Sequence, residues 1–386
     1  MVAQSDLAFR LQAVQHGATL TYTQMLHARN FVASKKFQSD NYDFDPSLEG
    51  LSSPSGVPVI AQIAGDDVHC MVEAAKILQA TGIDAIDVNL GCPQAIARKG
   101  GYGAFLGRQV DKTTEILSAL TSAIDVPITA KVRIQPDLGT TLDICKRIED
   151  TGISMLAVHG RTLEENKTAT KRANWRAIGE VRAALKIPVI GNGGIEYHSD
   201  IAKMISSTGV AGVMSSEGLL ENPSLFTPQP PDSSLSPRSI LNRQVALAKE
   251  YVSLAVAHPP VSCGGAGGHS TVKAHVFKIL YRALDNERFH DLRNRLGDSK
   301  CWKLEQTVGI IGEVEERLGG MEDGEIDFPV EEFSWYRRHR KPVNVQEPVR
   351  EMTEEERKAA IRERLIEMKM QREEKERSIK RCIVDL

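Results

Sequence analysis

Asn89 and Cys92 lie where a predicted strand ends and a loop begins. The apolar run at residues 83–90 is typical of a short buried strand, and Gly91 ends it. The loop that follows, at residues 91–103, is rich in glycine and basic residues. A thiol in this position can act as a nucleophile, a metal ligand or a proton donor. Most free cysteines are instead small buried hydrophobic residues, so Cys92 alone does not decide between these roles.

Other predicted strands also end in side chains that a binding site could use. Gln62 ends one strand and offers an amide that both donates and accepts, and His159 and Arg161 follow another. Lys131 and Arg133 are two residues apart on a strand, so their side chains share one face. Burying two cations is costly without an anionic partner, which a ligand could supply. A single such side chain is typical of a satisfied group at a sheet rim, but four successive strand ends of this kind favour a site.

Two later loops are made of small residues, and each leads into a predicted helix. The first contains Asn192, Gly193 and Gly194, and the second contains Ser216 and Glu217. In a (β/α)8 barrel the loops after the last two strands commonly bind phosphate, because glycine lets backbone N–H groups approach it. A phosphate site joined to the amide, lysine and histidine of the other strand ends is what flavin mononucleotide (FMN) requires. A cation near the flavin ring stabilises its anionic reduced form.

Short apolar runs alternate with amphipathic stretches over residues 1–228, which predicts βα units around a parallel sheet. A predicted helix at residues 5–15, with Ser5 or Asp6 as its N-cap, precedes the first of seven predicted strands. A closed (β/α)8 TIM barrel needs eight strands, so either its first strand would precede Met1 or the barrel is left open on one side. An open doubly wound sheet is the alternative, but no GxGxxG turn follows the first strand. The strands are predicted at residues 19–25, 58–63, 83–90, 127–132, 155–159, 188–191 and 211–215, and further helices at residues 68–80, 112–123, 142–150, 175–185 and 198–207.

A different pattern follows a linker rich in proline and serine at residues 227–238. Amphipathic stretches at residues 240–257, 271–285, 287–296 and 301–318 predict a small helical domain over residues 239–330. Residues 331–386 contain a basic and aromatic run at 333–341 and then a charge-balanced tail, which we expect to be a solvated helix or disordered.

Composition argues against several classes of protein. The 386 residues carry a formal net charge of −3, with 41% hydrophobic and 26% charged residues, so a nucleic acid would have to bind to a local basic patch. The six cysteines are far apart and form no CxxC pair, which argues against a zinc site or a disulfide framework. No apolar run approaches the ~20 residues of a membrane helix, and no signal peptide follows Met1. We therefore expect a cytoplasmic or nuclear monomer that uses no metal and no membrane.

Together these motifs resemble those of the tRNA-dihydrouridine synthases, and most of all the eukaryotic type that acts on positions 16 and 17 of the tRNA D-loop. The resemblance covers roughly residues 1–285, and the combination of NLGCPQ with YGAFL is specific. The matching stretches are YTQMLHAR (residues 22–29), NLGCPQ (89–94), YGAFL (102–106), AKVR (130–133), VHGRT (158–162), NGGI (192–195), SEG (216–218), NP (222–223) and VKAHVFK (272–278).

The resemblance implies a TIM barrel followed by a helical tRNA-binding domain, in an enzyme that uses FMN with NADPH or NADH. Such an enzyme delivers a hydride from the reduced flavin to C6 of a tRNA uridine, while a cysteine, here Cys92, protonates C5. Asn89 would orient the uracil, Arg133 would be a second contact, and the uridine would leave the base stack to reach the flavin. The family's flavin contacts correspond to Met1, Gln62, Lys131, His159, Asn192, Gly193, Gly194, Ser216 and Glu217.

The tRNA contacts expected from this resemblance are basic residues near the site and on the helical domain. Arg161 follows a barrel strand, and Lys99 lies in the loop after the predicted catalytic cysteine. Arg98 lies beside Lys99, and Lys273, His275, Lys278 and Arg282 share one predicted helix. The run at residues 335–341 adds aromatic side chains for stacking and several cations, although a solvated linker has the same pattern.

Two other functions remain open from the sequence. One is an FMN-dependent dehydrogenase of free pyrimidines, although a small substrate would not need a helical domain with a basic helix. The other is a flavin-free RNA-binding relative, because Met1 and Val2 align with the end of the family's Ala-Pro-Met-Val motif and its Ala-Pro flavin contact would precede them. Bound flavin in the purified protein distinguishes the enzymes from the RNA-binding relative.

Overall fold

Residues 4–166, 169–228, 235–261, 268–298, 303–326 and 334–336 are described by the structure, a computed structural model of the chain. They belong to one compact unit that spans residues 1–340, and residues 341–386 are a separate unit. The predicted flavin contact of Met1, the predicted cations at residues 337–341 and the charged tail all lie outside the described residues.

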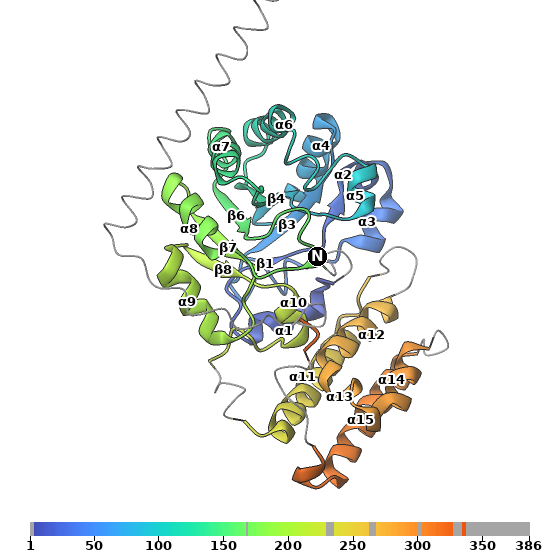
Figure 1. The fold of residues 1–386 in the computed structure, drawn as a ribbon. Helices are drawn as coiled ribbons and strands as arrows, with labels where there is room; N and C mark the ends of the chain where they lie inside the picture. Colours follow the sequence, from blue (N-terminus) through green and yellow to red (C-terminus); the bar gives the residue numbers. More distant parts are fainter. Residues whose placement is uncertain are drawn as a thin grey trace, which may run out of the picture. The chain divides into compact units, whose positions relative to one another are not determined.

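Parallel strands form a curved sheet with helices on its outer face, as in a TIM barrel (Figure 1). The first predicted strand contains only the short β1, and a second short strand, β2, begins just after the predicted range; both pair with β3. The other six strands lie close to the predicted positions. Every residue of β3 and β4 is buried, as expected for a parallel sheet that is covered on both faces. Among the described residues β8 makes no ladder with β1, so the ring of strands is open there. The strands are β1 (Thr21–Tyr22), β2 (Leu26–His27), β3 (Val59–Ala64), β4 (Ala85–Leu90), β5 (Ile128–Arg133), β6 (Met155–His159), β7 (Val189–Asn192) and β8 (Gly212–Met214).

The helices between the strands begin and bury one face as their sequences predict. In α4 (Val68–Gln79) the Asp67 carboxylate caps the first turn by accepting from the Cys70 N–H at 2.8 Å, and Met71, Ala74 and Leu78 face the core at helical spacing. The other helices of this part are α1 (Leu7–Gln15), α2 (Ala28–Ala33), α3 (Lys35–Asn41), α5 (Ala95–Lys99), α6 (Val110–Ala123), α7 (Leu138–Glu149), α8 (Trp175–Ala184), α9 (His198–Thr208) and α10 (Glu217–Glu221).

Helix α1 connects the barrel to the helices that follow it in the chain. Its N-cap is Asp6, which accepts from the Phe9 N–H at 3.2 Å and lies 2.8 Å from Nε2 of His275 on α12 (Gly268–Ile279). Burial opposes ionisation of Asp6, but His275, the Phe9 N–H and Arg10 together outweigh it and hold the pKa of the Asp6 carboxyl below its ordinary value. Gln12 donates to the Leu247 carbonyl on α11 (Pro237–Ala257) at 2.8 Å. The remaining helices are α13 (Tyr281–Leu284), α14 (His290–Gly297) and α15 (Leu304–Gly320).

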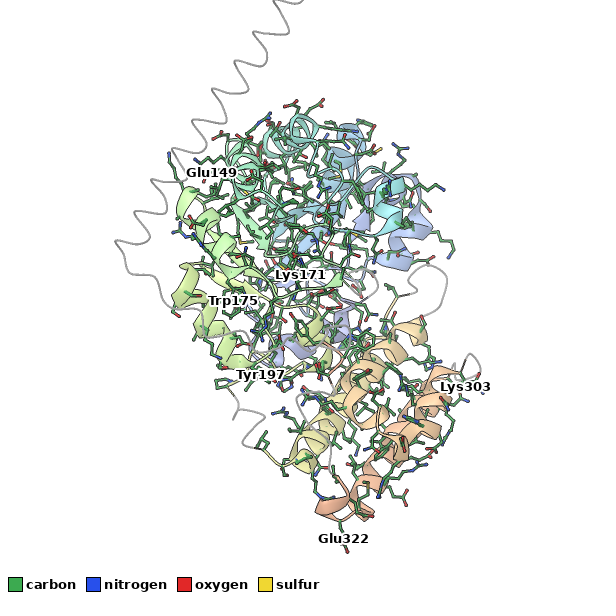
Figure 2. All side chains as sticks on the ribbon, in the orientation of Figure 1. Glu149, Lys171, Trp175, Tyr197, Lys303 and Glu322 are labelled. Carbon is green, nitrogen blue, oxygen red and sulfur yellow. The ribbon has the colours of Figure 1, made fainter. Side chains whose placement is uncertain are left out.

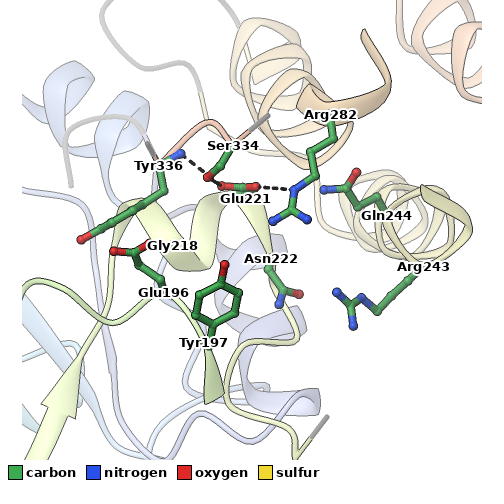
Figure 3. Close-up of a pocket in the computed structure, with 10 residues that line it drawn as sticks. All are labelled: Glu196, Tyr197, Gly218, Glu221, Asn222, Arg243, Gln244, Arg282, Ser334 and Tyr336. Atoms are coloured by element: carbon green, nitrogen blue, oxygen red, sulfur yellow. Dashed lines mark hydrogen bonds and ion pairs between the residues drawn. The ribbon is translucent and has the colours of Figure 1, made fainter. Parts of the chain in front are cut away.

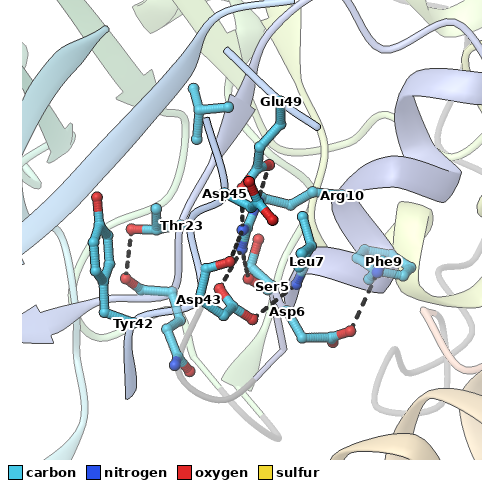
Figure 4. A network of polar contacts seen from close by, with 12 residues as sticks. Ser5, Asp6, Leu7, Phe9, Arg10, Thr23, Tyr42, Asp43, Asp45 and Glu49 are labelled. Atoms are coloured by element: carbon cyan, nitrogen blue, oxygen red, sulfur yellow. Dashed lines mark hydrogen bonds and ion pairs between the residues drawn. The ribbon is translucent and has the colours of Figure 1, made fainter. Parts of the chain in front are cut away.

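A buried ion cluster fixes α1 against the loop that precedes β3 (Figure 4). Arg10 is 2% exposed, and its guanidinium donates to Glu49 at 2.8 Å and to Asp43 at 3.0 Å. Burial alone would lower the pKa of Arg10, but the two carboxylates outweigh it and raise that pKa. Removing one partner of such a buried cluster typically costs roughly 3–5 kcal/mol, so α1 is held firmly at the open edge of the sheet.

Within the described ranges, no helix combines the length and apolar character that crossing a bilayer requires. The same part of the chain contains no group of three or more His, Cys, Asp or Glu side chains that could hold a metal ion.

Candidate functional site

A cavity of about 1110 Å³ lies at the carboxyl ends of the strands and reaches along the open edge between β8 and β1. It brings together thirteen residues that the sequence had placed on separate strand ends and on the helical domain. These are Gln62, Asn89, Cys92, Lys131, Arg133, His159, Arg161, Asn192, Gly193, Gly194, Ser216, Glu217 and Lys278. Among the predicted residues that the structure describes, the ones that are not part of its walls are Arg98, Lys99, Lys273, His275 and Arg282.

Asn89 shapes the loop that carries Cys92. Its side-chain oxygen accepts from the backbone N–H of Cys92 at 2.9 Å and from that of Gly91 at 3.2 Å. Its amide nitrogen donates to Oε1 of Gln62 at 2.9 Å. The oxygen of Asn89 is therefore occupied, and one N–H of its amide is left to face a ligand in the cavity.

Asp87 is a site residue that sequence reasoning missed. Its carboxylate is fully buried and accepts from Nε2 of Gln62 at 2.8 Å and from the Thr129 hydroxyl at 2.7 Å. Burial raises the pKa of Asp87 to about 6, against the effect of these two hydrogen bonds. Because an ionised carboxylate only accepts, Asp87 holds the Gln62 amide with its oxygen towards Asn89. The sequence does contain a sign of this role, because Asp87 is an acidic residue inside a mostly apolar strand.

The loop at residues 101–107 packs directly against the backbone of Cys92. The Ala104 N–H donates to the Cys92 carbonyl at 3.1 Å. Gly103 has φ +65°, and a Cβ atom there would lie 2.7 Å from the Cys92 carbonyl oxygen. The half-buried Cys92 side chain packs near Tyr102 and Ala97. Glycine at position 103 is therefore required both by the backbone conformation and by the close approach to Cys92.

Lys131 and Arg133 face the cavity from β5, but they are held differently. Arg133 donates to the Gly91 carbonyl at 2.8 Å and to the Thr162 carbonyl at 3.0 Å, so its guanidinium braces two loops. Burial and the nearby Arg161 lower its pKa to about 10. Burial and Arg133 lower the pKa of Lys131 to about 8, although Asp87 opposes this shift. An anionic or electron-rich ligand would favour the charged form of Lys131.

His159 is a neutral imidazole in this cavity. Burial, followed by the charges of Lys131, Arg133 and Arg161, lowers the pKa of His159 well below its ordinary value. Its Nε2 lies 3.1 Å from Nη1 of Arg161, which can only donate, so Nε2 is the acceptor and Nδ1 carries the proton. Arg161 is 5% exposed and also donates to the Lys171 carbonyl at 2.6 Å.

The loop after β7 forms a narrow cradle at one end of the cavity. Gly193 has φ +100° and Gly194 has φ +82°, a region that glycine adopts readily. A Cβ atom at Gly193 would lie 2.8 Å from the His159 ring, and one at Gly194 would lie 3.0 Å from Nε1 of Trp175. Trp175, which is labelled in Figure 2, begins α8. Its Nε1 donates to the Gly193 carbonyl at 2.9 Å. Side chains at these two positions would fill the cradle.

The loop after β8 completes the same end of the cavity. Asn192 ties the two loops together by donating from its amide to the Met214 carbonyl at 2.8 Å. Ser216 is the N-cap residue of α10, and Glu217 begins that helix. The glycine cradle, the cationic Lys131 and the cavity volume fit a flavin mononucleotide, whose phosphate needs close backbone approach and whose ring needs a nearby cation.

Lys278 brings α12 of the helical part to the same cavity. Its ammonium donates to the Gln4 side chain and, at 3.2 Å, to the Ala274 carbonyl. It also lies 5.5 Å from the centre of the Trp335 ring, a distance suited to a cation–π contact. A ligand in the cavity would therefore meet a cation from outside the barrel.

The remaining predicted tRNA contacts lie elsewhere. Lys99 is exposed on α5, and Lys273 donates to the Asp298 carbonyl at 2.7 Å on the helical part. His275 is fully buried, lies against Asp6, and stacks on Phe9 with ring centres 4.4 Å apart. The prediction for His275 is corrected accordingly, because a fully buried core side chain offers no surface to tRNA. The prediction for Arg282 is corrected as well, because its side chain is buried and pairs with Glu221 at 2.9 Å.

Residues 1–293 match the model of a protein family described as Dihydrouridine synthase. Three similar proteins carry the name tRNA-dihydrouridine(16/17) synthase, with NAD(P)(+) in the name. The one from Mus musculus, whose name adds "-like", is 38% identical over 74% of this chain and 54% of its own length. That from Saccharomyces cerevisiae is 36% identical over 77% of this chain and 67% of its own, and that from Schizosaccharomyces pombe is 38% identical over 85% and 79%.

The fold and these matches show that the chain belongs to the dihydrouridine synthase family. It spans just over half of the length of the mouse and rat relatives, 54% and 59%.

Proposed function

We propose that this chain reduces uridine to 5,6-dihydrouridine in tRNA, at positions 16 and 17 of the D-loop. The observation that carries the proposal is the position of Cys92, which lies in one cavity with Lys131 and the Gly193–Gly194 cradle. A proton donor and a flavin site in one cavity are the two parts that reduction of a carbon–carbon double bond needs. The position within tRNA rests on the names of the relatives from mouse and the two yeasts.

Bound FMN, reduced by NADPH or NADH, would supply the hydride that C6 of the uracil receives. Cys92 gives the proton of its thiol to C5, so that a hydride and a proton together saturate the C5–C6 bond. The free N–H of the Asn89 amide holds a uracil carbonyl, which keeps C5 facing the thiol. Neutral His159 would donate a hydrogen bond from Nδ1 to the flavin. Lys131 would supply positive charge near the flavin ring.

A polymeric substrate fits this cavity better than a free pyrimidine does. Lys278 reaches the cavity wall from α12, outside the barrel, and Arg98 and Lys99 are exposed on α5 just after the Cys92 loop. Phosphates of a nucleic acid would pair with such cations, whereas free uracil has no phosphate. A uridine of tRNA would have to be flipped out of its stack to meet Cys92.

The decisive experiment incubates the purified chain and FMN with NADPH and an unmodified tRNA transcript. Dihydrouridine is then mapped by mass spectrometry of nuclease fragments. We expect product at positions 16 and 17 and none from free uracil. Product from free uracil alone would identify a pyrimidine dehydrogenase instead. A colourless protein that FMN cannot reconstitute would contradict the enzyme proposal altogether.

A further inference from the structure

Ser334, Trp335 and Tyr336 return from far along the chain to the wall of the cavity. Trp335 and Tyr336 line it, and Ser334 is 6% exposed. The sequence predicts for this run either a tRNA contact or a solvated linker. For these three residues the prediction of a solvated linker is wrong, because they pack against the barrel and against α12.

The segment is anchored to a buried carboxylate, Glu221 (Figure 3). Oε2 of Glu221 accepts from the Ser334 hydroxyl at 2.7 Å and from the Tyr336 N–H at 3.1 Å. Oε1 accepts from Nε of Arg282 at 2.9 Å. Glu221 is 4% exposed and ends α10, the helix that begins at the loop after β8. A buried carboxylate that accepts three hydrogen bonds holds the segment firmly in place.

From this anchor Tyr336 reaches the glycine cradle. Its hydroxyl oxygen accepts from the Gly194 N–H at 3.0 Å and from Nη2 of Arg161 at 3.3 Å. Trp175 bonds the preceding residue, Gly193, so the cradle is held on both sides. Arg161 is likewise fixed along three directions, by Tyr336, by His159 and by the Lys171 carbonyl.

Trp335 fixes the other side of the segment to the helical part. Its ring meets Phe277 and Tyr281 edge to face, with centres 6.1 Å and 5.6 Å apart. Lys278 lies over the same ring. The segment thus connects α12, α10 and the cradle by specific contacts.

We propose that Tyr336 is a positioning residue of the cofactor site, which holds the Gly193–Gly194 cradle and Arg161 in the geometry that receives the flavin phosphate. The inference rests on the proposed function, since it takes FMN as the ligand. Two consecutive glycines with positive φ are conformationally free, so their shape must be set by partners outside the loop. The Tyr336 hydroxyl and the Trp175 indole are two such partners.

The test compares FMN with riboflavin, which has the same ring but no phosphate, by fluorescence titration of the full chain. Tyr336→Phe keeps the ring and removes the hydroxyl. We expect it to weaken FMN binding about tenfold and to leave riboflavin binding unchanged. Ser334→Ala, which removes one bond to Glu221, should weaken FMN binding in the same direction by less. Tyr281→Phe is the matched control, because it contacts Trp335 without lining the cavity.

Each outcome is decisive. An equal loss for both flavins, or no loss for either, would overturn the positioning role. Tighter FMN binding by Tyr336→Phe would also overturn it, because the hydroxyl would then compete with the phosphate for the Gly194 N–H. Wild-type protein that binds neither flavin would overturn the proposed function itself, and this inference with it. Thermal unfolding of each variant shows that the compared proteins are folded.

Discussion

The backbone N–H of Cys92 donates a 2.9 Å hydrogen bond to the side-chain oxygen of Asn89. The orientation of that amide is set in turn by Gln62, and the orientation of Gln62 by Asp87. The position of the thiol therefore depends on a chain of polar contacts that ends at the buried carboxylate of Asp87, which is on the same strand as Asn89.

Cys92→Ala should separate the two half-reactions of the proposed enzyme. Reduction of the flavin by NADPH does not use the thiol and should proceed at the wild-type rate. Reoxidation by tRNA should slow by about a hundredfold or more, since general acid catalysis is lost. Stopped-flow absorbance of the flavin under anaerobic conditions measures both steps. Cys70→Ala, on the outer helix α4, should leave both rates unchanged. Wild-type reoxidation by the Cys92 variant would remove the thiol from the mechanism.

Gly103→Ala should displace the backbone of Cys92 and leave its thiol unchanged. The new Cβ would meet the Cys92 carbonyl oxygen at 2.7 Å, so one of the two backbones must move. We expect dihydrouridine formation to fall at least tenfold, because a displaced donor loses alignment. Gly82→Ala is a matched control: it has φ +86° and nothing within 4 Å of the added atom, so it has similar backbone strain but no clash. Equal activities of the two variants would show that the contact at position 103 is unimportant.

Asp87→Asn should change how stability depends on pH. The folded-state pKa of Asp87, about 6, is above the ordinary 3.8, so the fold favours the protonated form. Its contribution is fully present below pH 3.8 and is lost as the pH rises through about 6. The unfolding free energy of wild type minus that of Asp87→Asn should thus fall by about 2 kcal/mol between pH 4 and pH 7, out of about 3 kcal/mol over the whole titration. Urea titrations at pH 4 to 7 measure it. A constant difference would contradict the raised pKa.

Flavin affinity should weaken in mildly alkaline solution. In the free protein the pKa of Lys131 is lowered to about 8 by burial and Arg133, so its charge is lost as the pH rises through that value. If the bound flavin needs the cation, its dissociation constant should rise up to about tenfold between pH 7 and 9. Fluorescence titrations across this range, with Lys131→Met as reference, measure the effect. The Met variant should bind more weakly and show no such rise. The same pH dependence in both proteins would assign it to another group.

Lys278 and Lys273 should contribute unequally to tRNA binding. Lys278 lines the cavity, whereas Lys273 bonds to the Asp298 carbonyl away from it. Lys278→Ala should weaken tRNA binding and lower the slope of log affinity against log salt concentration by about one. Lys273→Ala should have a smaller effect, and Lys36→Ala, on the distant α3, none. Filter binding at several salt concentrations distinguishes these cases. An unchanged affinity for the Lys278 variant would remove α12 from the binding surface.

The strand ends were predictable because each combines an apolar run with a polar or glycine stop, as at Asn89, Lys131 and His159. Parallel strands place such ends at one edge of a sheet, so a shared site followed from the repeat of βα units. The short extent of β1, and the separate strand β2 after the predicted range, were not predictable, since both depend on pairing with β3.

Other features depend on contacts between distant residues. His275 looked like a surface cation beside Lys273 and Lys278, yet its partner Asp6 is the N-cap of the first helix. Asp87 owes its role to neighbours on two other strands. The position of Tyr336 depends on Gly194, 142 residues earlier. No local periodicity reports such pairings, because each is set only when the whole chain is packed.

The contacts of α1 bear on how the protein folds during synthesis. Gln12 pairs with Leu247, and Asp6 with His275, so the first helix has no native partners on α11 or α12 until most of the chain has been made. Translation proceeds at about 5–20 residues per second, so more than ten seconds pass between synthesis of α1 and synthesis of its partner on α11. The side of α1 that α11 and α12 cover in the native fold therefore stays exposed until those later helices emerge from the ribosome.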